Sequence, residues 1–415
     1  EGNNRQRGKK IVMAYIFQRL KRFCCFIAGF VFFISGILKL LDPVGAGLVM
    51  DEYFSFLHIG FLGFASKAAG TAFALAEAIL GAAMVTGVWR RSTAIAAFIF
   101  QGFFTVLTLI LVIFNPEMDC GCFGEAIHLT HWQTFLKNIA LIVLLLIAYI
   151  PMSSLGEPKK RKYVSFSLVA LSVAAFTLYS LMYIPMVDFT EYKPGAVLRS
   201  AKASVPEDDM YEAVFIYEKD GRQESFTLQH LPDSTWSFVS TETVLKKEFE
   251  DKGVNLSFYG SDDEYRDELA AEGKVMVISV YDTDMKKGRW TRIARHIEAS
   301  EKAGFRALLL TASSPDLVTE FMEEVGEESR SIIERHLYFS DYKTLITLNR
   351  SNGGATYFSD GELICKWAFR SFPDQKKLEE VSRDNDTEAS MGRSTGKDLA
   401  FEGFLLYVTA VMLLL

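Results

Sequence analysis

The stretch Asn115–Trp132 reads NPEMDCGCFGEAIHLTHW and separates two long apolar runs, residues 93–114 and 132–151. A helix needs about 20 mostly apolar residues to cross a bilayer, and both runs satisfy this length. The stretch is therefore predicted to be a short loop at a membrane surface. It carries Cys120 and Cys122, two of the five cysteines in the chain.

The composition of the whole chain predicts one membrane domain and one soluble domain. Half of the 415 residues are hydrophobic, and 34 are Phe. Long apolar blocks fill the first 187 residues, residues 188–398 have an ordinary charged composition, and a last apolar run follows. The net charge of −7 averages two unlike halves. Because no long basic stretch lies in the soluble part, we expect no nucleic acid partner.

Five segments have the length and apolar character of membrane spans, and the lipid bilayer is therefore an expected partner. The spans are Phe23–Leu41, Ala68–Trp89, Thr93–Phe114, Trp132–Pro151 and Val164–Met186. A sixth apolar run, Phe401–Leu415, is short and is expected to act as a C-terminal anchor. Residues 51–64, DEYFSFLHIGFLGF, are too short and mixed to span and are expected to form an interfacial helix.

Basic residues predict the orientation of these spans. The clusters RLKR (19–22), WRRS (89–92) and EPKKRK (157–162) fall on one side if the spans alternate. Lys and Arg accumulate on the cytoplasmic side of membrane proteins. The N-terminus is therefore predicted to be cytoplasmic, with the Cys-Gly-Cys loop and residues 188–398 facing outward.

Polar residues inside the predicted spans are candidates for function, because burying them in lipid is costly. Glu77 lies among small residues near the middle of the second span. It is either a structural carboxyl hydrogen-bonded inside the bundle or a proton-handling carboxylate beside a quinone. Lys39 is expected to snorkel to the interface. Gln101 and Asn138 are expected to form hydrogen bonds between helices.

Three interpretations of Cys120 and Cys122 remain open. The pair faces a compartment where thiols oxidise, and a small strained disulfide ring exchanges readily, so the pair suits redox exchange. Alternatively, Cys120, Cys122, His128 and His131 form the pattern C-x-C-x₅-H-x₂-H, whose ligand types suit zinc or copper. The third interpretation is a structural loop. Cys24 and Cys25, at the other end of the first span, are expected to be inert thiols.

The membrane part resembles a known family. SGILKLLDP (35–43) resembles the first-span signature of DoxX-like proteins, and CGCFG (120–124) followed by HWQTFLKN resembles their MauE branch. The segment 183–199, YIPMVDFTEYKPGAVLR, resembles the type found in Bacteroidetes. The resemblance implies a four-helix core and a dithiol/disulfide pair at Cys120 and Cys122. It also implies the inner membrane of a Gram-negative bacterium, with the loop in the periplasm, and quinone as the cofactor to consider.

The soluble part is predicted to begin with short strands around residues 211–240, with turns at Asp220-Gly221 and Pro232-Asp233. Residues 274–315 read strand–helix–strand, and the helix is expected to end at Gly304. A helix over 315–336, a strand at KTLITLN (343–349) and a hairpin through Asp360-Gly361 complete the pattern.

This order of elements resembles a thioredoxin-like fold over residues 255–382. A thioredoxin carries Cys-x-x-Cys after the first of these strands and a cis-proline before the penultimate strand. Here these places read DTDMKKGRW (282–290) and RSNGGATYF (350–358). Cys365 is alone on the last strand and is expected to lie in the core. The resemblance therefore implies a domain that docks a partner rather than one that exchanges disulfides.

The predicted fold class is a membrane α-helical bundle, with a four-helix DoxX/MauE-like core and anchoring spans, joined to a soluble α/β thioredoxin-like domain. Its predicted parts are the four-helix domain, the fifth span with its linker, a β-rich segment, the thioredoxin-like domain and a C-terminal anchor. They cover residues 13–152, 153–187, 188–254, 255–382 and 383–415.

Three functions follow as hypotheses, and the sequence leaves open whether the protein is an enzyme. The first is thiol–disulfide exchange or electron transfer by the loop, with a periplasmic protein or a quinone. The second is a non-catalytic scaffold that binds an envelope protein through the degenerate domain. The third is transport of a small molecule or a metal.

Overall fold

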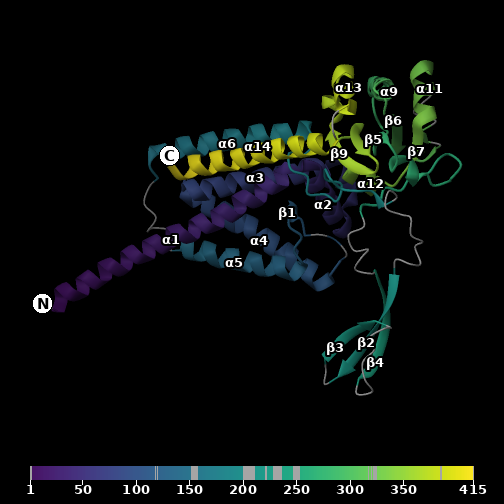
Figure 1. Cartoon of the computed structure of the whole chain (residues 1–415). Helices are drawn as coiled ribbons and strands as arrows, with labels where there is room; N and C mark the ends of the chain where they lie inside the picture. The colour runs from purple at the N-terminus through teal and green to yellow at the C-terminus, as the bar shows by residue number, and fades with distance from the viewer. Residues whose placement is uncertain are drawn as a thin grey trace. The chain divides into compact units, whose positions relative to one another are not determined.

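A computed structural model describes residues 2–116, 118, 120–150, 158–199, 211–219, 222–227, 236–245, 253–315, 317–318, 320, 325–383 and 386–414. The chain forms two compact units (Figure 1). The first, called the helical unit, comprises Glu1–Thr190 and Gly392–Leu415. The second, called the α/β unit, comprises Glu191–Met391.

The helical unit is built from long helices, with one short strand between two of them. Its elements are α1 (Gly2–Leu41), α2 (Pro43–Phe56), the 3₁₀ helix η1 (Gly60–Ala65), α3 (Ser66–Thr86), α4 (Arg90–Phe114), β1 (Cys122–Glu125), α5 (His131–Tyr149), α6 (Lys160–Met182) and α14 (Asp386–Leu414). Helices α1, α3, α4, α5 and α6 supply five candidate membrane spans, which confirms the five expected from the sequence.

The expected interfacial segment 51–64 is divided between α2 and η1. Helix α2 begins earlier than expected, at Pro43, where the Asp42 side chain accepts a hydrogen bond from the Gly45 backbone N–H. Helix α2 ends at Phe56, and His58, two residues further on, adopts a positive φ of 59°. Asp42 therefore has a capping role that its charge alone did not predict.

Small residues allow α1 and α3 to pack closely. A Cβ atom added to Gly36 would lie 2.5 Å from the Ala78 backbone nitrogen, and one added to Gly81 would lie 2.4 Å from that of Phe33. Membrane helices commonly use such small residues to bring their backbones together. This contact fixes the relative positions of side chains on the two helices.

The last apolar run is helical and joins the bundle. Phe401, Val408 and Met412 of α14 are buried in the same cluster as residues of α1, α3 and α6. Ser165 Oγ of α6 donates a hydrogen bond to the Val411 carbonyl oxygen at 2.7 Å, so α6 and α14 lie side by side (Figure 1). Helix α14 is not among the five candidate spans of the described residues.

The α/β unit contains two sheets. The smaller sheet has the order β3-β2-β4 and is antiparallel, and the larger has the order β7-β6-β5-β8-β9. Its elements are β2 (Tyr211–Lys219), β3 (Arg222–Thr227), β4 (Ser237–Leu245), η4 (Asp267–Ala270), β5 (Lys274–Val280), α9 (Lys287–Lys302), β6 (Arg306–Thr311), α11 (Glu327–His336), β7 (Leu337–Phe339), α12 (Tyr342–Leu348), β8 (Gly354–Ser359), β9 (Glu362–Trp367), η5 (Phe369–Ser371) and α13 (Gln375–Arg383).

The larger sheet is mixed. Strand β5 pairs in parallel with β6 and antiparallel with β8, and β8 pairs antiparallel with β9. The parallel β5–β6 pair confirms the predicted strand–helix–strand unit, and Gly304 follows α9 with φ 89°. Asp360 and Gly361, with φ 46° and 78°, form the predicted hairpin turn.

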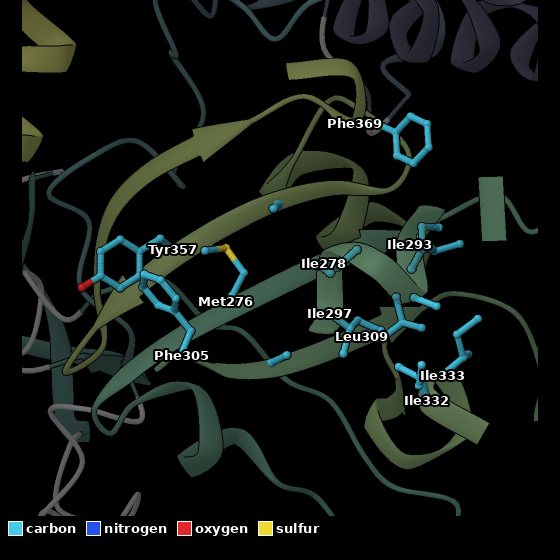
Figure 2. Packing of buried hydrophobic residues seen from close by; sticks show 14 of the residues in the cluster. Met276, Ile278, Ile293, Ile297, Phe305, Leu309, Ile332, Ile333, Tyr357 and Phe369 are labelled. Atoms are coloured by element: carbon cyan, nitrogen blue, oxygen red, sulfur yellow. The ribbon is translucent and has the colours of Figure 1, made fainter. Parts of the chain in front are cut away.

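Apolar side chains cover both faces of this sheet. One cluster joins β5, β6 and β8 to α9, α11 and α13, and Figure 2 shows Ile278, Ile293 and Leu309 among its members. The other cluster includes Tyr192, Leu198 and Phe258, so the chain just before β2 contributes to the core of the sheet. Cys365 is buried in the first cluster, which confirms its predicted core position.

One predicted strand is wrong. KTLITLN (343–349) was expected to be extended, but Tyr342–Leu348 forms α12. The Asp341 side chain accepts a hydrogen bond from the Thr344 backbone N–H and caps this helix, which buries Leu345 and Leu348. The helix expected over 315–336 is observed at Glu327–His336. The predicted turns at 220–221 and 232–233 lie outside the described residues, although β2 and β3 pair as a hairpin across the first of them.

Candidate functional site

The candidate site is the loop between α4 and α5. Helix α4 ends at Phe114, and its C-cap residue Asn115 has a positive φ of 42°. Helix α5 begins at His131 after a capping box, in which Thr130 and Gln133 each accept a backbone hydrogen bond from the other residue. The His131 ring contacts the Asn115 side chain through Nδ1 at 3.3 Å and the Met118 carbonyl oxygen through Nε2 at 3.0 Å. His131 thus joins the two ends of the loop.

The backbone on both sides of Gly121 is anchored to neighbouring helices. The Tyr53 hydroxyl of α2 donates a hydrogen bond to the Cys120 carbonyl oxygen at 3.0 Å. Ser35 Oγ of α1 donates one to the Cys122 carbonyl oxygen at 2.6 Å. Helix α2 therefore anchors the main chain at Cys120, and helix α1 anchors it at Cys122. Both hydrogen bonds are accepted by carbonyl oxygens and not by sulfur atoms.

Gly121 is required by both conformation and space. Its φ is +58°, a left-handed conformation that costs a residue with a side chain about 1 kcal/mol or more. A Cβ atom added there would lie 2.4 Å from Val49 Cγ1 of α2. The turn between the cysteines therefore presses directly onto α2.

The two thiols share one apolar cluster. Cys120 is 6% exposed and packs with Tyr53, Leu107 and Leu111. Cys122 is half-buried and packs against the same cluster, as do Val49, Phe56, Phe104 and Met118. The pair is therefore unequal, because Cys122 is the more exposed of the two cysteines.

Glu77 forms an ion pair that the sequence did not predict. Lys39 Nζ of α1 lies 2.6 Å from Glu77 Oε2 of α3, and the two side chains are 16% and 12% exposed. Lys39 was expected to snorkel, but the close packing of α1 on α3 directs it to a partner inside the bundle. Its Nζ also lies 5.9 Å from the centroid of the Phe104 ring, which packs against the cysteine cluster. Phe104 therefore lies near the Lys39 ammonium and packs against the cluster that contains Cys120.

The predicted hydrogen bonds between spans are confirmed for Gln101 and Asn138. Gln101 Nε2 donates to the Asn138 carbonyl oxygen at 3.3 Å. Asn138 Nδ2 donates to Thr108 Oγ1 at 3.1 Å. These bonds hold α4 against α5, the two helices that the loop connects.

The metal alternative concerns Cys120, Cys122, His128 and His131. Within the described residues, no three His, Cys, Asp or Glu side chains gather as ligands. His131 holds the loop ends as described above, and His128 is exposed. The remaining cysteines of the unit lie near the start of the first span, where Cys24 is buried and Cys25 Sγ donates to the Tyr149 hydroxyl at 3.4 Å.

In the α/β unit, segments 281–289 and 350–354 lie together and are joined by hydrogen bonds of Asn352. Its Oδ1 accepts hydrogen bonds from the backbone N–H groups of Tyr281 and Asp282, at 3.0 and 3.2 Å. Its Nδ2 donates to the Asp282 carbonyl oxygen at 2.7 Å, and Arg289 donates to the Asn352 carbonyl oxygen at 2.7 Å. An amide side chain, not a thiol, therefore joins these segments.

Comparison with protein families places two parts of the chain. Residues 15–151 match the family model described as methylamine utilisation protein MauE. Residues 211–248 match a domain of unknown function, DUF8463. No curated protein and no solved structure matches the chain. Residues 15–151 are therefore similar to the MauE family, and five apolar helices among the described residues are long enough to cross a membrane.

Proposed function

We propose that Cys120 and Cys122 carry out thiol–disulfide exchange with a partner on the outer side of the bacterial inner membrane. The observation that carries this proposal is the shared environment of the two cysteines. Their backbones are fixed by Tyr53 and Ser35, and their side chains meet in one apolar cluster. The spacing closes only a small ring, and strained disulfides of this kind are the readily exchanged ones.

The unequal exposure of the thiols supports different roles for them. In the oxidised loop, a thiolate of the partner attacks Cys122 Sγ, forms a mixed disulfide and releases Cys120 as a thiolate. A second thiolate of the partner then attacks the mixed disulfide and releases Cys122. The partner dithiol becomes a disulfide, and the loop gains two electrons and two protons.

Reoxidation of the loop needs an acceptor of two electrons and two protons, and a membrane quinone has this chemistry. The quinone becomes a quinol while the sulfur–sulfur bond of the loop reforms. Phe104 connects the cysteine cluster to the Lys39–Glu77 pair, so Glu77 is the carboxylate we assign to proton handling during this step.

The test is trapping of mixed disulfides in cells that express the full-length protein. In a Cys120→Ser variant, the Cys122 thiolate attacks the disulfide of an oxidised partner and releases one partner thiolate, and because Cys120 is missing it cannot displace the other partner sulfur, so covalent partner adducts should accumulate. A Cys122→Ser variant should trap fewer because Cys120 is buried. A Cys24→Ser/Cys25→Ser variant is the matched control and should behave as wild type. Equal trapping by all three variants, or none by any, would rule the exchange role out.

A second candidate function is a scaffold that holds an envelope protein through a thioredoxin-like α/β unit. Strands β6-β5-β8-β9 lie in this order within the larger sheet, with β5 parallel to β6 and antiparallel to β8 and with α9 between β5 and β6, which supports the thioredoxin-like assignment. The hydrogen bonds of Asn352 favour the scaffold role, because they join the two segments where a thioredoxin would carry out disulfide exchange. Loss of partner capture on deletion of the α/β unit, with capture unchanged in Cys120→Ser/Cys122→Ser, would support the scaffold over the exchange role.

A further inference from the structure

A second site lies at the other end of the helical unit from the Cys-Gly-Cys loop. There α1 at residues 22–26, the end of α3, the start of α4, the end of α5 and the start of α6 surround a cavity of about 380 Å³. Helix α4 runs from this cavity to the loop, so the two sites are separated by the length of α4. The thiol chemistry of the loop does not use this cavity.

The charge of the cavity lining favours an anion. Four cationic side chains line it, and the described lining includes no carboxylate; the cations are Arg22, Arg90, Lys159 and Lys162. Two helices also begin here, α4 at Arg90 and α6 at Lys160, and neither has a side-chain cap. The N-terminal amides of a helix carry partial positive charge and bind phosphate and other anions.

The floor and wall of the cavity add a donor and an apolar surface. Tyr149 lines the cavity and is 2% exposed, and its hydroxyl accepts a hydrogen bond from Cys25 Sγ. A phenol hydroxyl that accepts one hydrogen bond can also donate one, here to a ligand oxygen. Phe26, Met84 and Val85 supply an apolar wall beside the cations. A phosphate group attached to an acyl chain matches both halves of this lining.

Topology alone does not explain this convergence. Basic residues on the cytoplasmic side orient spans by their number near the ends of the spans, wherever they point. Arg91 and Arg161 serve that purpose equally well and are exposed outside the cavity lining. Arg22, Arg90, Lys159 and Lys162 come from three separate segments of the chain and meet at one cavity.

We propose that this cavity binds a phosphate-bearing anion, with the headgroup at the four cations and Tyr149 and the apolar part along Phe26, Met84 and Val85. The phosphate can come from an anionic lipid or from a soluble phosphate, and the apolar wall favours the lipid. Binding there would fasten the ends of α3, α4, α5 and α6 to one another.

The test titrates the full-length protein in neutral detergent with short-chain phosphatidylglycerol, short-chain phosphatidylcholine and inorganic phosphate, and counts bound molecules by native mass spectrometry. We expect one phosphatidylglycerol to bind saturably and more tightly than phosphatidylcholine. Arg22→Gln/Lys159→Gln should weaken it about tenfold, because each basic residue adds to the attraction of anionic lipid. Arg91→Gln/Arg161→Gln removes the same charge outside the cavity and should leave the affinity unchanged.

The three ligands and the two double variants distinguish the possible sources of phosphate, and they also show which result would contradict the proposed site. Saturable binding of inorganic phosphate that competes with the lipid would identify the phosphate group itself as the ligand. Equal binding of the two lipids, or equal loss in the two double variants, would overturn the site. Unfolding temperatures measured without added lipid show whether either double variant is merely misfolded, and Arg90→Gln gives an independent test of the same cavity.

Discussion

The Cys-Gly-Cys loop of the helical unit and the paired segments 281–289 and 350–354 of the α/β unit are both tied by hydrogen bonds, but through different atoms. In the loop, Ser35 and Tyr53 hold main-chain carbonyl oxygens of the cysteines. In the α/β unit, the Asn352 side chain itself occupies the junction. Anchoring through the main chain keeps side chains for chemistry, whereas anchoring through a side chain uses that position for stability.

The largest expected effect concerns the Lys39–Glu77 ion pair and its influence on the loop. Glu77→Gln leaves Lys39 charged and without its partner inside the bundle, and breaking a buried ion pair in this way costs about 3–5 kcal/mol. We expect a large fall in the unfolding temperature in detergent and faster alkylation of Cys122, since Phe104 lies near the Lys39 ammonium and packs against the same cluster as Cys122. Lys39→Met/Glu77→Leu removes both charges and should recover most of the stability. An unchanged alkylation rate in Glu77→Gln would show that the pair and the loop are independent.

The next effect tests the turn between the cysteines. Gly121→Ala combines a left-handed φ with a Cβ atom that would lie 2.4 Å from Val49, so we expect a loss of about 2–3 kcal/mol. Gly102→Ala is the matched control, because a Cβ atom there meets nothing within 4 Å in the interior of α4. It should be neutral or slightly stabilising. Trapping of mixed disulfides should fall in Gly121→Ala and persist in Gly102→Ala, and similar behaviour of the two would remove the conformational argument.

Local patterns predicted the spans, the β5–α9–β6 unit and the β8–β9 hairpin, because each rests on hydropathy, caps and turn residues within a short window. They did not predict Lys39–Glu77, whose partners are 38 residues apart and meet only through the packing of α1 on α3. They also missed Tyr53 and Ser35 as anchors of the loop. Asp341 was an available signal for α12, since Asp before an apolar run caps helices.

A third prediction tests the α/β side of the comparison. Asn352→Ala removes the acceptor for the Tyr281 and Asp282 N–H groups and the donor to the Asp282 carbonyl oxygen, so we expect a loss of about 2 kcal/mol. Amide hydrogen exchange at these two residues should accelerate. Asp284→Ala, an exposed change in the same segment, should have little effect on either quantity. Unaltered exchange in Asn352→Ala would mean that this junction is not held by the Asn side chain.

The smallest effect concerns His296 on α9, the helix that follows the same junction. Its ring stacks on Phe372 at 4.0 Å, and burial, with a contribution from nearby Arg292, lowers the pKa of His296 from 6.5 to about 4.

Between pH 6.5 and about pH 4 the unfolded chain binds a proton at His296 that the folded chain does not bind. The stability that the neutral His296 contributes is therefore fully present above pH 6.5 and is lost as the pH decreases below it. From pH 7.5 to 5.5 we expect a loss of about 1.4 kcal/mol from this residue. The loss is measured by amide exchange of α9 in the full-length protein. His296→Phe preserves the stacking without a titrating group, so the difference between wild type and variant isolates the histidine. If wild type and His296→Phe lose the same stability on acidification, the pH dependence comes from other groups. Our assignment of His296 as a neutral residue packed in the core would then be wrong.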